Sequence, residues 1–112
     1  MKLSEIIDIL SATIHSDPID LDIPIESCKA SDLLSDVLKN PIDHSILLTG
    51  LNHLQVVRTA EMMDIKAVVF VRNKKPSQEM IRLASINGIA LLSTEYKLFK
   101  CCGLLYSHGL RE

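Results

Sequence analysis

The sequence of 112 residues contains no tryptophan, and only two tyrosines and two phenylalanines. Proteins that bind single-stranded nucleic acid stack the bases on aromatic side chains, and duplex-binding domains carry strongly basic surfaces. This chain has a net charge of −2 and an isoelectric point near 6.1. The composition therefore predicts that nucleic acid is not a partner.

Long apolar runs are also missing. The longest run has about five residues, whereas a transmembrane helix needs about 18 or more. Near the N-terminus, Asp8 interrupts the one stretch that resembles the apolar part of a signal peptide. We expect no membrane segment and a cytoplasmic location.

Cysteine is scarce, and its spacing carries no metal or redox motif. The three cysteines are Cys28, Cys101 and Cys102, with no Cys-x-x-Cys among them. An odd count argues against a disulfide framework, and free cysteine packs as a small apolar residue, so we expect buried free thiols. The four histidines lack metal-ligand spacing, and no nucleophile–base pair can be nominated. We expect no metal, no cofactor and no enzymatic activity.

The charges are distributed unevenly along the chain. Residues 1–43 hold three lysines against nine acids, so 3 − 9 = −6; residues 44–112 hold nine basic residues against five acids, so 9 − 5 = +4. Such asymmetry could orient two copies in a dimer or attract an anionic ligand to the basic part. A scatter of solvated surface charges is the alternative.

Three apolar runs of strand length, at residues 45–49, 67–71 and 89–93, alternate with amphipathic helical patterns. Strands that are apolar on both faces belong to parallel sheets covered by helices on both sides, and the alternation is that of βαβ crossovers. We predict a single three-layer α/β domain over residues 1–112 with a mainly parallel sheet. A helix at residues 4–10 and weaker strands at 13–15 and 25–30 should extend or flank it.

Helix ends and buried faces can also be predicted. Hydroxyl side chains can cap the helices at Ser4, Ser31, Ser77 and Thr94, and Asn40-Pro41, Asn87-Gly88 and Gly109 are expected to end helices. The residues expected to face the core are Leu3, Ile6, Ile7 and Leu10; Leu33, Leu34, Val37 and Leu38; Leu54, Val57, Ala60, Met62 and Met63; Met80, Ile81, Ala84 and Ile86; and Leu98 and Leu105.

The best candidate for a binding site is the set of loops that follow the three strong strands. In open parallel sheets, ligands sit beyond the carboxyl ends of the strands, where helix N-termini favour anions. The candidate residues there are Thr49, Gly50, Asn52, His53, Arg72, Asn73, Ser93 and Thr94. They could hold a nucleotide or a phosphorylated metabolite. Helix capping explains Asn52 and Thr94 equally well, and no phosphate-binding glycine motif is present.

Three strings together resemble the stand-alone DRTGG-domain proteins: Met1 to Ile7, Lys29 to Leu38, and Ile89 to Thr94. The similarity runs over essentially the whole chain, and the segment Ala-Ser-Asp-Leu-Leu-Ser-Asp-Val is its most specific part. The resemblance implies a fold like the N-terminal domain of HPr kinase/phosphorylase, which is related to that of the Mur ligases. In larger proteins, DRTGG modules accompany CBS domains in regulated pyrophosphatases and occur in some phosphotransacetylases, as regulatory or dimerising units.

The chain departs from that family at both motifs that give it its name. Where the family carries Gly-Asp-Arg, this chain has Gly50-Leu51-Asn52, and Val71-Arg72-Asn73 replaces the Thr-Gly-Gly turn, while Pro76 matches a later proline of the family. The first hypothesis is therefore a non-catalytic regulatory or interaction module, forming a homodimer or binding an unknown protein partner. The second is a sensor that binds a small anionic ligand at the strand ends.

Overall fold

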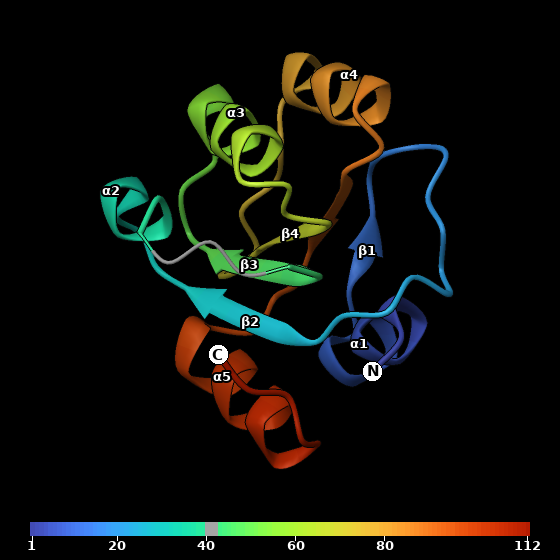
Figure 1. Cartoon of the computed structure of the whole chain (residues 1–112), viewed down its shortest axis with the longest axis vertical. Coiled ribbons are helices and arrows are strands. Elements are labelled where there is room, and N and C mark those ends of the chain that lie inside the picture. The colour runs from blue at the N-terminus through green and yellow to red at the C-terminus, as the bar shows by residue number, and fades with distance from the viewer. Residues whose placement is uncertain (40–42) are drawn as a thin grey trace.

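The computed structural model describes residues 1–39 and 43–112. The elements follow one another as α1 (Leu3–Leu10), β1 (Thr13–Ile14), β2 (Ser27–Ala30), α2 (Leu34–Val37), β3 (Ser45–Thr49), α3 (Leu54–Met62), β4 (Ala67–Phe70), α4 (Gln78–Ile86), β5 (Ala90–Ser93) and α5 (Leu98–Ser107) (Figure 1). The predicted alternation of strands and helices is confirmed from β2 onward.

The sheet has five strands in the order β1-β5-β4-β3-β2. The pairs β2–β3, β3–β4 and β4–β5 are parallel, and β1 is antiparallel to β5. All residues of β3, β4 and β5 are buried, as their unbroken apolar runs predict. The mainly parallel three-layer α/β architecture is confirmed, and the two weaker strands form its edges.

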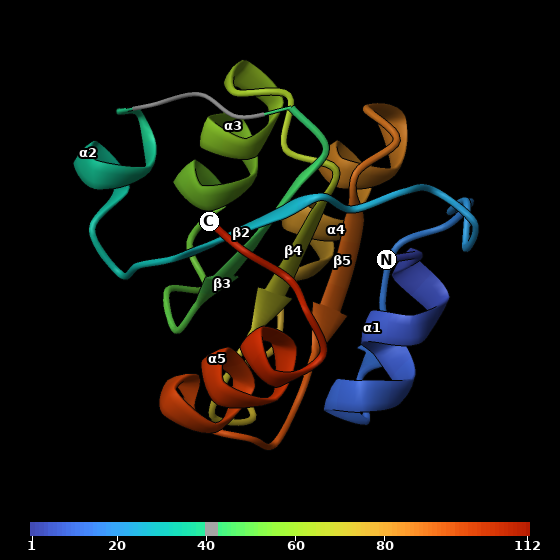
Figure 2. The same cartoon turned by 60° about the horizontal axis from the view of Figure 1, so that its bottom comes forward.

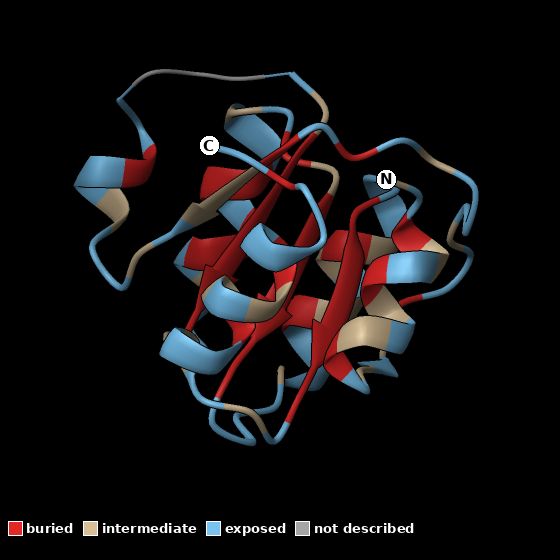
Figure 3. Ribbon diagram, turned by 90° about the horizontal axis from the view of Figure 1, so that it is seen from below, coloured by how far each residue is buried: buried red, intermediate tan, exposed pale blue. Residues whose placement is uncertain are grey.

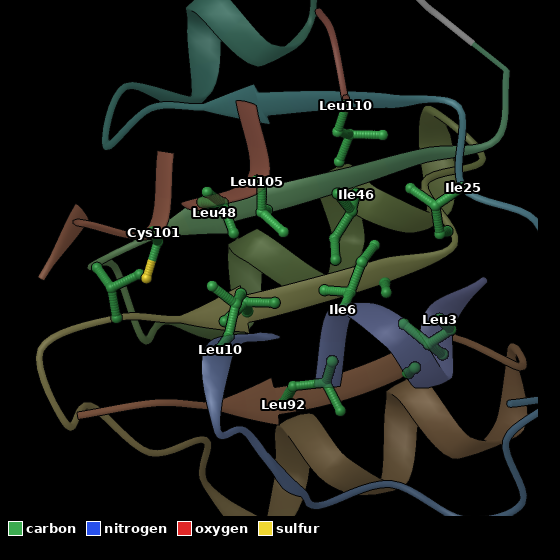
Figure 4. Packing of buried hydrophobic residues seen from close by; sticks show 14 residues of the cluster. Leu3, Ile6, Leu10, Ile25, Ile46, Leu48, Leu92, Cys101, Leu105 and Leu110 are labelled. Carbon is green, nitrogen blue, oxygen red and sulfur yellow. The ribbon is translucent and has the colours of Figure 1, made fainter. Parts of the chain in front are cut away.

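Helices cover both faces of the sheet. On one face, α2, α3 and α4 pack over Leu47, Val68 and Phe70. On the other, α1 and α5 lie beside each other over Ile46 and Leu48 (Figures 2 and 4). Figure 3 shows the buried strands as the middle layer between them. Successive residues of each strand therefore serve two different cores.

The sheet is shielded at both edges. The two residues of β1 cover β5 along part of its length. At the other edge the backbone N–H of Cys28 donates to the carbonyl of Arg111 at 2.8 Å, so the C-terminal segment pairs with β2. This segment uses backbone groups of β2 that would otherwise be open to another strand.

Three of the predicted caps are wrong. The first helix begins after Lys2 rather than Ser4, because the carboxylate of Glu5 accepts from the N–H of Lys2. The second begins after Leu33, and the Ser31 hydroxyl instead accepts from the N–H of Leu33 in a turn. The last begins after Lys97, three residues beyond Thr94.

The cap predicted at Ser77 is confirmed: its side chain accepts from the N–H of Met80. The helix end at Asn87-Gly88 is confirmed as well, with Gly88 at φ +68°. Gly109, at φ +102°, directly follows the C-cap of α5. The helix end predicted at Asn40-Pro41 lies outside the described residues.

Four apolar residues expected in the core are exposed: Leu33, Leu38, Met62 and Ile86. The helix α2 has only four residues, so it presents a single buried side chain, Val37, rather than a stripe. Met62 and Ile86 each follow a buried alanine of their helix, Ala60 and Ala84, by two residues, and residues two apart on a helix do not share a face. All three cysteines are free, as predicted, with Cys101 buried and the other two half-buried.

Candidate ligand site at the strand ends

The loops after β4 and β5 lead to opposite faces of the sheet. From β4 the chain passes to α4 on one face, and from β5 it passes to α5 on the other (Figure 1). Adjacent parallel strands whose following helices diverge in this way leave a crevice between their loops. This is the place where open α/β sheets bind ligands.

A hollow of about 150 Å³ lies at this point. Its lining comes from three segments: the end of α1 with the start of β1, the loop after β4, and the loop after β5. The lining residues are Ser11, Thr13, Asn73, Lys75, Ser93, Thr94, Glu95 and Tyr96. Polar side chains predominate, and the volume suits a phosphate-sized group or one end of a larger ligand.

The loop after β5 is held by hydrogen bonds to the N-terminal part of the chain. The Thr94 hydroxyl donates to the carbonyl of Leu10 at 2.7 Å and accepts from the N–H of Tyr96. The Ser93 hydroxyl lies 2.7 Å from Nε2 of His15. Both hydroxyls are buried, so they fix the wall of the hollow.

The loop after β4 adopts an unusual backbone conformation. Arg72 and Asn73 both have φ +59°, which is uncommon for residues other than glycine. Their N–H groups donate to the carbonyls of Tyr96 and Thr94 at 2.8 Å each. Because these donors are already used, the loop offers side chains to a ligand rather than a backbone cradle.

Two side chains of that loop are themselves linked. The Lys75 ammonium donates to the Asn73 side-chain oxygen at 3.1 Å, and the Asn52 amide donates to the Lys75 carbonyl at 3.1 Å. Lys75 is exposed and belongs to the lining of the hollow, so it is the positive charge available to an anion there. His53 is exposed at the start of α3 and makes no side-chain capping bond within the described residues.

A second cluster joins β2, β3 and β4 at the same end of the sheet. The Asp32 carboxylate accepts from the N–H of Gly50 at 2.6 Å and from the Thr49 hydroxyl at 3.1 Å. Its other oxygen lies 3.9 Å from the Arg72 guanidinium. The guanidinium of Arg72 occupies the space that a side chain at Gly50 would take. The absence of a side chain at Gly50 therefore admits Arg72.

His15, whose imidazole contacts Ser93 of the hollow, has a lowered pKa. Burial, and to a smaller extent the nearby Lys75 ammonium, lower the pKa of His15 from its ordinary value of 6.5. At neutral pH the imidazole is therefore neutral. Its Nε2 can act as donor or acceptor toward Ser93, according to the tautomer.

Six of the eight predicted candidate residues fall into two groups, and Asn52 and His53 belong to neither. Asn73, Ser93 and Thr94 line the hollow, whereas Thr49, Gly50 and Arg72 gather around Asp32. The helix start predicted at Ser31 would put Asp32 in the first turn of that helix. This is wrong, since Asp32 lies before α2 and binds the end of β3. The eight candidates do not include Lys75, Tyr96 or Ser11. Of these only Lys75 carried a signal, as a basic residue in a strand-end loop.

Two classes of feature are missing from the described residues. They hold no group of three or more histidine, cysteine or acidic side chains that could hold a metal ion. Nor do residues 1–39 and 43–112 form a helix long and apolar enough to cross a membrane.

Comparison with known proteins shows the fold. No family model and no curated protein matches the chain. Among solved structures, it is similar to the CBS and DRTGG domains of the regulatory region of Clostridium perfringens pyrophosphatase, a structure complexed with the activator diadenosine tetraphosphate. The TM-score is 0.76 at 22% sequence identity, over 93% of this chain and 45% of the other. The chain therefore spans less than half of that structure, and its DRTGG-like fold, implied by the sequence resemblance, is confirmed.

Proposed function

We propose that the chain is a non-catalytic regulatory module that responds to a small anionic ligand. The ligand binds in the crevice between the ends of β4 and β5. The observation that carries this proposal is the divergence of α4 and α5 to opposite faces, with a polar hollow where they part. The ligand class is a nucleotide or another phosphorylated metabolite.

The chemistry of the hollow supports an anion. Lys75 supplies a positive charge, while the Asn73 amide and the Ser11 and Tyr96 hydroxyls supply neutral donors. The Ser11 and Tyr96 hydroxyls lie 3.3 Å apart and are partly solvent-accessible, so a ligand oxygen can compete for them. Glu95 also lines the hollow and opposes an anion. It favours a ligand that also carries hydrogen-bond donors, such as the ribose or base of a nucleotide, over inorganic phosphate.

The structural neighbour supports a regulatory role. That structure contains a regulatory region with a bound nucleotide activator. By analogy, this fold serves in the present chain to respond to a metabolite rather than to transform one. We also propose that residues 1–112 act as one domain and that the chain forms a homodimer.

A thermal-shift titration of the full chain tests which class of ligand binds. Inorganic phosphate, ATP and diadenosine tetraphosphate are compared at rising concentration. A ligand at about 100 times its Kd stabilises the folded state by about 2.7 kcal/mol. For a domain of this size that corresponds to a rise in Tm of roughly 10 °C. We expect the rise with a nucleotide and a smaller one with phosphate.

Two neighbouring lysines provide a matched pair of variants. Lys75→Ala removes the charge in the hollow, whereas Lys74→Ala removes a charge from the same exposed loop without lining it. We expect Lys75→Ala to weaken binding at least tenfold and Lys74→Ala to change it less than threefold. Equal losses would indicate general charge attraction, and a screen without any shift would overturn the proposal.

A further inference from the structure

A second cavity, which we call the C-terminal pocket, lies between the edge strand β2, the last turns of α5 and the C-terminal residues. Its volume is about 220 Å³, and it shares no lining residue with the hollow between β4 and β5. Figure 2 shows the chain leaving α5 and running back to β2 across this region. The bond from the Cys28 N–H to the Arg111 carbonyl, at 2.8 Å, ties that segment to the sheet. One side of the pocket is therefore formed by a segment that is held in place.

The walls of the C-terminal pocket are mostly apolar. Leu105 and Leu110 line it and are buried. The other apolar contributions include the half-buried thiols of Cys28 and Cys102. Burial raises the pKa of both thiols, that of Cys28 to about 12, so they are uncharged at neutral pH and pack as small apolar groups. These walls suit the apolar part of a small ligand.

Arg111 brings a positive charge to the pocket and is held in one position by three contacts. Its Nη1 donates to the carbonyls of Tyr106 and Leu110 at 2.9 Å each, and its Cζ lies 3.9 Å from the centroid of the Tyr106 ring. Nε and Nη2 have no partner in residues 1–39 and 43–112. A guanidinium fixed in this way, with its Nε–Nη2 edge open, is arranged to bind a carboxylate through two parallel hydrogen bonds.

Glu112 also lines the pocket and decides which carboxylate fits. No ion pair joins it to Arg111 in the part of the chain that the structure describes. Its carboxylate repels a simple anion and attracts an ammonium group. A ligand that complements both charges carries a carboxylate and an ammonium group, as an α-amino acid does.

The volume of the pocket limits the size of the ligand. An apolar cavity of about 150 Å³ holds benzene, which has six heavy atoms. In the same proportion, the 220 Å³ of the C-terminal pocket correspond to about nine heavy atoms. Leucine has this size, whereas a nucleotide is far too large.

We propose that the C-terminal pocket binds an apolar α-amino acid of the size of leucine. The side chain lies between β2 and α5, the carboxylate binds Arg111, and the ammonium group lies near Glu112. This site is independent of the anion crevice, because the two share no residue. A ligand this small binds modestly, so we expect a Kd between about 10 µM and 1 mM.

Titration of the isotope-labelled full chain with leucine, up to about 10 mM, followed by two-dimensional NMR, measures both affinity and location. We expect the amide signals of Cys28, Cys102 and Arg111 to shift, while those of Asn73 and Glu95 in the crevice stay in place. Two analogues test the charges: 4-methylpentanoate lacks the ammonium group, and 3-methylbutylamine lacks the carboxylate. Each should bind at least tenfold more weakly than leucine.

Two variants and a matched control test the residues. Arg111→Gln removes the charge but keeps the backbone carbonyl that binds Cys28, and it should weaken leucine binding at least tenfold. The control is Arg82→Gln, which removes an exposed arginine from α4 and should leave leucine binding unchanged. Cys102→Leu fills part of the pocket, so it should abolish leucine binding without lowering Tm by more than a few degrees.

Four results would overturn the proposal: no shift with leucine at any concentration, shifts confined to residues outside the pocket, binding unchanged in Arg111→Gln, or an equal loss in Arg82→Gln. Binding of 4-methylpentanoate as tight as that of leucine would overturn the assignment to an amino acid. Circular dichroism of each variant confirms that it is folded. Nucleotide titration of Arg111→Gln keeps this test distinct from that of the crevice, since that variant should bind a nucleotide as the original chain does.

Discussion

Replacing Asp32 by alanine tests whether the cluster at the ends of β2, β3 and β4 holds the sheet together. The change removes the acceptor of the Gly50 N–H, a short bond of 2.6 Å to a charged oxygen, and that of the Thr49 hydroxyl. Gly50 and Thr49 are both buried, so their donors are left with little access to water. The Arg72 ion pair, at 3.9 Å and half-exposed, adds little.

The magnitude follows from these contacts. A hydrogen bond to a charged group contributes about 1.5–3 kcal/mol, and a neutral one about 0.5–1.5. The Asp32 side chain is 46% exposed, so water replaces part of both. We expect Asp32→Ala to lower the free energy of unfolding by about 2–3 kcal/mol. Asp32→Asn keeps an uncharged acceptor and should cost about 1 kcal/mol.

Urea unfolding followed by circular dichroism measures the loss as a shift in midpoint at constant slope. The control is Asp36→Ala, which breaks the exposed pair with Lys39 at 3.5 Å and should cost no more than about 0.5 kcal/mol. If Asp32→Ala and Asp36→Ala cost the same, the short bond to Gly50 does not stabilise the fold and the reasoning fails.

Three further outcomes are expected. Because the pKa of His15 is lowered in the folded state from 6.5, the unfolded chain binds more protons below that pH, so the free energy of unfolding should fall as the pH drops below about 6.5. His15→Gln should flatten that dependence in urea titrations at pH 5.5 and 7.5, and an unchanged slope would refute the assignment. The Ser45 hydroxyl is fully buried and has no partner in the described part of the chain, so Ser45→Ala should leave stability unchanged or raise it by about 1 kcal/mol in the same assay. A loss above about 1 kcal/mol would instead point to a bound water. Burial raises the pKa of Cys28 to about 12 and that of Cys101 to about 11, so iodoacetamide at pH 8 should label them roughly 10²–10³ times more slowly in the native than in the unfolded protein, and equal mass-spectrometric labelling rates would contradict this.

Much of the fold could be predicted because its signals are local. The run Ala67 to Val71 is apolar throughout, and a strand buried on both faces requires just that. Pro76-Ser77 predicts a helix start because the serine hydroxyl caps a backbone N–H three residues on. Neither signal needs information about the rest of the chain.

The misplaced features depend on distant contacts. Asp32 follows a serine and precedes leucines, which is a typical helix start. Its carboxylate instead binds Gly50, 18 residues later, because β2 and β3 are parallel neighbours. Thr94 likewise donates to the carbonyl of Leu10, 84 residues away. Residues such as Ser11 and Tyr96 join the hollow only because α1 and α5 share one face of the sheet.

The bond between Cys28 and Arg111 has a consequence for folding. Its two partners are 111 − 28 = 83 residues apart, and contacts of such large sequence separation form late because loop closure costs entropy. Until this bond forms, one side of β2 presents unpaired backbone N–H and C=O groups with which another chain can pair. Removing residues 111 and 112 would leave that side of β2 unpaired while keeping the buried Leu110, so the shortened chain should aggregate during refolding.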